Sequence, residues 1–179
     1  MTVFLVRHAL LDEAAGGSAG GLSERGRRQA QRVADHLGDR PFERIISSPA
    51  VGCVETVQPL AVARRLRVET SALLDATPVD VDAVTSMLLE SCEPGAVVCC
   101  GGDVVAAVVS AIRAAGGELV LPDGDTTVRW EKGSAWVLEC HDARFVRGAY
   151  VPPPQRTATT GAHTHPSFTA DAPRRAGSS

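Results

Sequence analysis

The sequence predicts an α/β fold in three layers, α/β/α, in which a mostly parallel sheet carries an antiparallel edge. First, an unbroken apolar run from Val3 to Val6 leads directly into Arg7 and His8, which is typical of a buried parallel strand that ends at a ligand-binding edge. Second, strand-like and helix-like segments alternate to about residue 115, which favours right-handed crossovers and parallel pairing. Third, short strand-like segments separated by turns extend to residue 150, which is typical of hairpins at a sheet edge.

The first helix is predicted after a glycine-rich loop at residues 14–21. Ser23 is a suitable N-cap, the apolar residues behind it have helical spacing, and Gly38 ends the helix. The loop lacks the Gly-Lys-Ser/Thr ending of a P-loop. We therefore interpret it as a connection rather than a phosphate cradle.

Apolar periodicity and turn residues place the remaining elements. In chain order, these are a strand at 44–48, a helix from about 50 to 62 with a kink at Pro59, a strand at 67–70, a turn at 74–78, a helix with Val84, Met87 and Leu88 on its apolar face, a strand at 95–100, a helix through 104–112, and strands at 126–130, 134–140 and 144–150.

The chain of 179 residues is long enough for one domain and a tail. We predict a domain at residues 1–150 and a disordered tail at 151–179, because the latter segment is dominated by Pro, Thr, Ala and Gly. His163 and His165 could bind a metal there, but we expect no metal site, because the segment is predicted to be flexible.

Composition excludes several function classes. The net charge is −3 with both signs interspersed, which does not indicate a nucleic-acid partner. Asp103 and Arg113 interrupt the apolar stretch at residues 96–115, which argues against a membrane span. Arg7 and His8 end the first apolar run too early for a signal peptide, so we expect a cytoplasmic protein.

The five cysteines are odd in number and lack the C-x-x-C spacing. We interpret them as buried, reduced thiols, and we expect neither a metal nor another cofactor. Cys99 and Cys100 are adjacent on a predicted strand, so their side chains should point to opposite faces.

Four motifs resemble those of one family. Leu5-Val6-Arg7-His8-Ala9 resembles the RHG/RHA signature of the histidine phosphatase superfamily, the phosphoglycerate mutase-like proteins. The resemblance covers about residues 2–150. The other segments are Leu22-Ser23-Glu24-Arg25-Gly26 with Gln29-Ala30, similar to "LTxxGxxQA"; Ser47-Ser48-Pro49 with Glu55-Thr56, similar to "SSPLxRAxxTA"; and residues 131–138, similar to the "KGSxWVL" segment of small, SixA-like domains, some of them fused to Nudix hydrolases.

The resemblance implies phosphoryl transfer onto His8, followed by hydrolysis or onward transfer. An imidazole suits this role because its unperturbed pKa of ~6.5 leaves much of it neutral near pH 7. Arg7 would hold the phosphoryl oxygens as a planar, bidentate donor, and Ser48 would also bind substrate. Asp75, in a segment similar to the family's "LxE", would protonate the leaving group, with Asp103 as a second candidate.

Two positions depart from the family pattern. The resemblance places a second arginine at Gly52 and a second histidine at Gly101. Losing one preorganised donor costs ~10²–10³ in rate. Two interpretations stay open: a phosphohydrolase of full or weak activity, or a degraded pseudophosphatase that binds a phosphorylated small molecule or a phosphoprotein. The two glycines leave space in the substrate site, and nothing in the sequence indicates an oligomeric state.

Lys132 is a candidate replacement cation. An antiparallel edge strand begins where the parallel strands end, so Arg129 and Lys132 should lie at the catalytic rim. We hypothesise that Lys132 donates to the phosphoryl oxygens. The alternative is an ordinary solvated lysine in a turn.

Overall fold

The structure is a computed structural model that describes residues 1–15, 20–125 and 127–154. The predicted tail, including His163 and His165, lies almost entirely outside the described residues. Val151, which we assigned to the tail, is the last residue of a strand.

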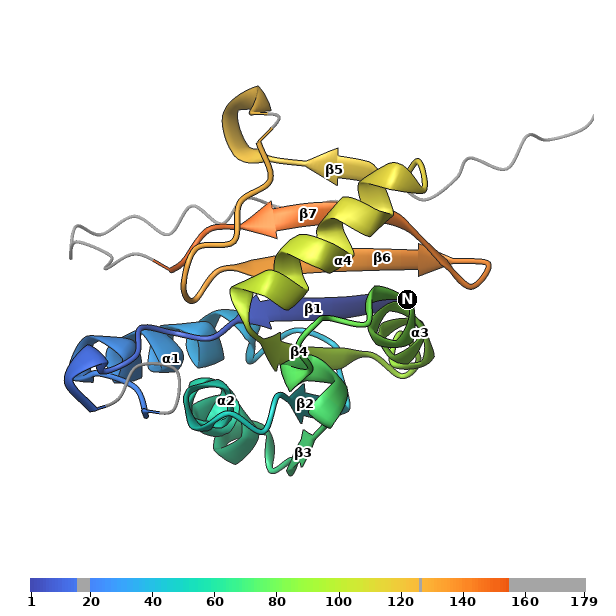
Figure 1. Ribbon diagram of the computed structural model, residues 1–179. Coiled ribbons are helices and arrows are strands. Elements are labelled where there is room, and N and C mark those ends of the chain that lie inside the picture. The colour runs from blue at the N-terminus through green and yellow to red at the C-terminus, as the bar shows by residue number, and fades with distance from the viewer. Residues whose placement is uncertain (16–19, 126, 155–179) are drawn as a thin grey trace, which may run out of the picture.

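Within the described residues, seven strands form one sheet in the order β3-β2-β4-β1-β6-β7-β5 (Figure 1). The first four of these are mutually parallel, β6 is antiparallel to β1 and to β7, and β5 is parallel to β7. This confirms the mostly parallel sheet with an antiparallel edge. The strands are β1 (Thr2–Arg7), β2 (Arg44–Ser47), β3 (Val68–Thr70), β4 (Ala96–Cys100), β5 (Glu118–Val120), β6 (Ala135–His141) and β7 (Arg144–Val151).

Helices cover both faces of the sheet, which confirms the three layers. The helices are α1 (Glu24–Leu37), α2 (Val51–Arg64), α3 (Val81–Glu90) and α4 (Gly102–Ala114). One core joins α1 and α2 to the sheet, and the other joins α3 and α4 to its opposite face. Figure 1 shows α4 crossing the sheet on the side nearer the viewer. Cys99 belongs to the first core and Cys100 to the second, as the alternation of a strand requires.

All five cysteines are buried and unpaired, which confirms our interpretation of them. No helix among the described residues is long and apolar enough to cross a membrane. Helix α2 continues through Pro59 without interruption.

The predicted strand at 126–130 is wrong. The described residues there form a loop. Two of its backbone carbonyls accept hydrogen bonds from side chains instead of from a neighbouring strand. The Arg7 Nη1 donates to Trp130 O (2.5 Å), and the Trp136 Nε1 donates to Arg129 O (2.9 Å). The edge position is taken by β5, which we did not predict. Its three residues are too few to show a periodic pattern, and pairing with β7 makes them a strand.

Candidate active site

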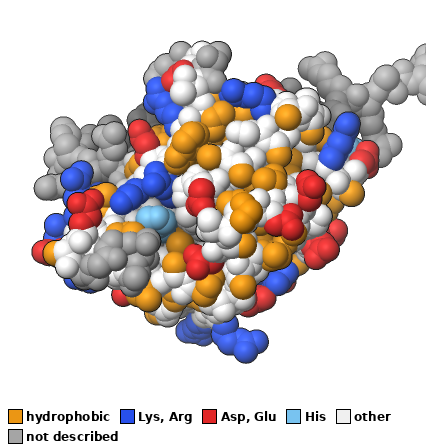
Figure 2. Space-filling model, viewed as in Figure 1, with side chains coloured by type: hydrophobic (Ala, Val, Ile, Leu, Met, Phe, Trp, Pro, Cys, Tyr) orange, Lys and Arg blue, Asp and Glu red, His pale blue; other side chains and the backbone are white. Residues whose placement is uncertain are grey.

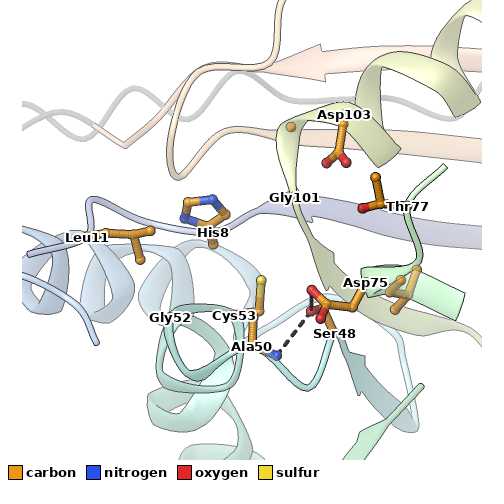
Figure 3. A pocket seen from close by; sticks show the side chains of 12 residues that line it. His8, Leu11, Ser48, Ala50, Gly52, Cys53, Asp75, Thr77, Gly101 and Asp103 are labelled. Carbon is orange, nitrogen blue, oxygen red and sulfur yellow. Dashed lines mark hydrogen bonds between the residues drawn. The ribbon is translucent and has the colours of Figure 1, made fainter. Parts of the chain in front are cut away.

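A cavity of about 380 Å³ opens at the end of the sheet where the parallel strands terminate (Figure 3). This is where open α/β sheets bind ligands. Its lining comes from the segments after β1, β2 and β4, from the first turn of α2 and from the 3₁₀ segment at residues 72–75 and its continuation. The lining residues are His8, Leu11, Ser48, Ala50, Gly52, Cys53, Leu74, Asp75, Thr77, Gly101, Gly102 and Asp103.

One of the two ring nitrogens of His8 is free to react. Its Nδ1 lies 2.8 Å from the backbone oxygen of Ala9. A carbonyl oxygen only accepts hydrogen bonds, so Nδ1 carries the hydrogen in the neutral ring. The lone pair is therefore on Nε2, which is the atom available for nucleophilic attack.

The pKa of His8 is lowered from its ordinary value of 6.5, mainly because burial disfavours the imidazolium. The hydrogen bond to Ala9 opposes this shift, the charges of Arg7 and Lys132 reinforce it, and the charge of Asp103 opposes it. The ring is accordingly neutral at pH 7, the state that a nucleophile requires.

The backbone around His8 is held from two sides. Its N–H donates to Cys100 O in β4 (3.1 Å), so the strand pairing extends to His8. The next N–H, of Ala9, donates to the Thr56 hydroxyl (2.9 Å), which itself donates to Gly52 O in α2 (2.6 Å). Thr56 is fully buried. It therefore fixes the distance between the nucleophile loop and α2, a role that we did not predict.

Arg7 lies beside the cavity but does not line it. Besides its bond to Trp130, its guanidinium packs on Gly102, where an added Cβ would come within 2.8 Å of Nε and 2.9 Å of Cζ. The Nε itself is buried and has no hydrogen-bond partner among the described residues. Arg7 thus acts on His8 through its charge and retains unused donors.

The structure places Lys132 at the predicted rim. The N–H of the following residue, Gly133, donates to the backbone oxygens of Arg7 (3.1 Å) and His8 (3.2 Å), so the turn is fastened to the end of β1. The Gln29 amide, from α1, donates to the backbone oxygen of Lys132 and accepts from the N–H of Leu10 (3.2 Å). We had used Gln29 only as part of a motif, and its role as a clamp between two loops of the site was missed.

Asp75 and Ser48 meet in the cavity. The buried Ser48 hydroxyl donates to Asp75 Oδ1 (3.1 Å) and accepts from the N–H of Ala50 at the start of α2 (3.1 Å). Ser48 therefore orients the Asp75 carboxyl group, and its own proton is not directed at a ligand in this arrangement.

Gly52 is covered by Leu11. A Cβ built on Gly52 would lie closer than 3.0 Å to the Leu11 Cδ2, a separation that real Cβ atoms essentially never show. The space in which the resemblance places a second arginine is thus partly filled by an apolar side chain.

Gly101 has a similar neighbour. A Cβ built on it would overlap the Asp103 Oδ1. Asp103 stands in the first turn of α4, where the partial positive charge of the helix terminus favours a carboxylate. Where the resemblance places a second histidine, this chain has a glycine and a carboxylate beside it.

Cys53 is a further lining residue that we had treated only as core. Side-chain hydrogen bonding with Cys99, and to a lesser degree with Ser48, lowers the pKa of its thiol, although burial works in the opposite direction. Among the described residues, no group of three or more His, Cys, Asp or Glu side chains is arranged to hold a metal ion.

Comparison with known proteins shows a family similarity in the N-terminal part of the chain. The family model of the Histidine phosphatase superfamily (branch 1) matches residues 3–77, the segment that supplies His8, Ser48 and Asp75. Comparison with curated proteins gives no match.

Solved structures similar to this one include three phosphatases, all with low sequence identity. The protein histidine phosphatase SixA, complexed with tungstate, is 18% identical with a TM-score of 0.65, and the match covers 84% of this chain and 94% of that one. A mycobacterial glucosyl-3-phosphoglycerate phosphatase with bound VO3 is 18% identical with a TM-score of 0.62, covering 83% and 96%. The phosphoserine phosphatase of Entamoeba histolytica with 3-phosphoglyceric acid is 14% identical with a TM-score of 0.62, covering 84% and 96%.

These structures share the fold of this chain. Over residues 3–77, which contain the RHG-like motif, the chain is similar to the histidine phosphatase superfamily (branch 1).

Proposed function

We propose that this protein is a phosphohydrolase that acts on a phosphomonoester or a phosphohistidine-type substrate through a phosphohistidine intermediate on His8. The observation that carries the proposal is the His8 ring itself, with Nδ1 bound to Ala9 O and Nε2 left for the cavity. The lowered pKa of His8 supports it, because the neutral ring is the nucleophilic form.

In the first step, His8 Nε2 attacks phosphorus, the bond from phosphorus to the leaving oxygen breaks, and Asp75 gives that oxygen its proton. In the second step, Asp75 takes a proton from water, the water oxygen bonds to phosphorus, and the P–N bond breaks to release inorganic phosphate and free imidazole. The charges of Arg7 and Lys132 favour the negative charge that spreads over the equatorial oxygens.

We assign the proton donor to Asp75 rather than to Asp103. Asp75 is oriented by the Ser48 hydroxyl, and a proton donor needs a fixed direction towards the leaving oxygen. Asp103 sits at the start of α4, and among the described residues no side chain orients its carboxyl group in this way.

A second candidate is a pseudophosphatase that binds a phosphorylated ligand or protein without turnover. The overlap of Leu11 with position 52, and of Asp103 with position 101, favours it, because neither replacement donates a hydrogen bond to a phosphoryl oxygen. For either function we propose a reducing compartment such as the cytoplasm, which the five free thiols support.

Hydrolysis of p-nitrophenyl phosphate and of a phosphohistidine peptide tests the proposal. We expect His8→Asn to abolish turnover and His36→Asn to retain it. His36 is the matched control, because it is another histidine of the domain with a pKa lowered by burial and lies on α1, away from the lining of the cavity.

Equal turnover in wild type and His8→Asn would contradict the proposal. Absence of turnover in the wild type, together with tungstate binding that is weakened by Arg7→Ala, would instead favour the pseudophosphatase.

A further inference from the structure

The site is electrically asymmetric. Arg7 and Lys132 act on His8 from outside the cavity, whereas the two acidic residues that line it are Asp75 and Asp103. Among the described lining residues there is no lysine or arginine, and within the described part of the chain neither carboxyl group has an ion-pair partner. Figure 2 shows the same pattern: a histidine side chain reaches the surface with lysine or arginine side chains on one side and acidic ones on the other.

The in-line geometry of phosphoryl transfer determines which part of a substrate would face each side of the cavity. In phosphoryl transfer the attacking and leaving atoms lie roughly in line through phosphorus. A leaving group therefore sits across the cavity from the nucleophile. In Figure 3, the side chains across the cavity from the His8 ring are those of Asp103, Thr77 and Asp75.

The two carboxyl groups then have different tasks. Under the proposed function, Asp75 enters the first step as an acid, so it carries its proton when substrate is bound. Asp103 takes no part in the proton transfer, and among the described residues no cation pairs with its carboxyl group. Since its carboxylate also lies over the first turn of α4, it occupies the helix terminus that would otherwise favour an anionic group of the ligand.

We infer that the substrate is a small phosphomonoester whose leaving group carries an ammonium group, as in the phosphate ester of an amino alcohol, and that Asp103 is the residue that selects it. This inference rests on the proposed function. The phosphoryl group faces the cationic side of His8, and the ammonium faces Asp103. A leaving group with a carboxylate is disfavoured, because it would meet a like charge.

The test compares three phosphomonoesters of similar size: phosphoethanolamine, propyl phosphate and phosphoglycolate. The measured quantity is the ratio of kcat/KM for phosphoethanolamine to that for propyl phosphate. Their intrinsic reactivities differ, but this difference cancels when the ratio is compared between variants. The matched control for Asp103→Asn is Asp82→Asn, the same change in the first turn of α3.

We expect Asp103→Asn to lower this ratio by about two- to fivefold, the range for one solvent-exposed ion pair, and to raise relative activity on phosphoglycolate. Asp82→Asn should leave both unchanged. High salt should lower the wild-type ratio, because an exposed pair is screened. Unchanged ratios in Asp103→Asn would overturn the inference and leave the hydrolase intact.

Binding separates failure of the inference from failure of the proposed function. If no ester is hydrolysed, calorimetric titration of the wild type with the same three compounds decides. Tighter binding of phosphoethanolamine that Asp103→Asn removes would support the selectivity and refute the hydrolase. Equal binding, or none, would refute the inference.

Discussion

The contact between Leu11 and Gly52 can be tested by a double-mutant cycle. Gly52→Ala adds only a Cβ, and Leu11→Ala removes the atom that this Cβ would overlap. Gly52 is buried in the first turn of α2, beside the cavity. The cycle therefore measures directly how tightly the apolar side chain occupies the space of residue 52.

The magnitude follows from two opposing effects. Replacing glycine by alanine in a helix stabilises by roughly 0.5–1 kcal/mol when there is room for the methyl group. In the wild type the new Cβ would be closer than 3.0 Å to Leu11 Cδ2, and ordinary contact begins at 3.4 Å, so the leucine must move by more than 0.4 Å (3.4 − 3.0). Overpacking of a tight core costs about 1–3 kcal/mol. The cost here falls at the lower end of that range, because Leu11 Cδ2 is the end of a flexible side chain that borders the cavity.

We therefore expect Gly52→Ala to be neutral or destabilising in the wild type and stabilising in the Leu11→Ala background. The coupling free energy should be about 1 kcal/mol, within the range seen for residues in contact. Urea unfolding followed by circular dichroism gives the four free energies of unfolding. Leu73→Ala serves as the control partner, because Leu73 is partly exposed and does not line the cavity. Its effect should add to that of Gly52→Ala within about 0.5 kcal/mol.

Additivity of Leu11→Ala and Gly52→Ala would refute the reasoning, because it would mean that Leu11 moves away from the added Cβ at no cost in free energy. The same logic extends to activity. Gly52→Arg should raise phosphatase activity only when combined with Leu11→Ala, since a guanidinium can reach the cavity only after the leucine is shortened.

Three further predictions follow from the same geometry. Gly26→Ala should destabilise the domain by more than 1 kcal/mol in urea unfolding, because its Cβ would overlap the backbone oxygen of Leu10, which cannot rotate away; a wild-type unfolding midpoint would contradict this. The kcat/KM should fall as the pH decreases through the lowered pKa of His8, below 6.5, because protonation removes the nucleophile. Since burial disfavours the charged ring, the free energy of unfolding should also fall as the pH drops below 6.5. This fall should be smaller in His8→Asn. Lys132→Ala should lower kcat/KM by about tenfold and move the acid limb to higher pH, because its charge lowers the pKa of His8, whereas Arg129→Ala, at an exposed residue paired with Asp125, should change neither.

The sequence predicts the first strand and the His8 that follows it well because the signal is local. Val3 to Val6 are buried on both sides of β1, and a continuous apolar run is what such a position demands. The caps and turns at the start of α1 are equally local: the Ser23 hydroxyl accepts from the Gly26 N–H, as its N-cap position predicts.

The parts that were missed depend on contacts between distant segments. Strand β5 exists because β7 lies beside it, and Trp130 is kept out of a strand because Arg7 takes its carbonyl oxygen. Gln29 and Thr56 are polar residues on helices, and only the fold brings them to the backbone of the nucleophile loop.

Gly52 and Gly101 show what the sequence does not reveal about the cavity. The sequence indicates what is lost at each position but not what replaces it. Leu11 and Asp103 take up that space only after the loops following β1 and β4 are folded, so the apolar and acidic character of the cavity could not be predicted from residue types alone.

Alkali-stable, acid-labile phosphorylation during turnover tests the central claim most directly. Wild-type protein incubated with ³²P-labelled phosphoethanolamine or acetyl phosphate, quenched rapidly in alkali and digested with trypsin, should yield one labelled peptide, residues 8–25. The phosphoryl group should be on the His8 imidazole, and the label should be lost in acid. Label on any other residue, or turnover without a labelled histidine, would contradict the account.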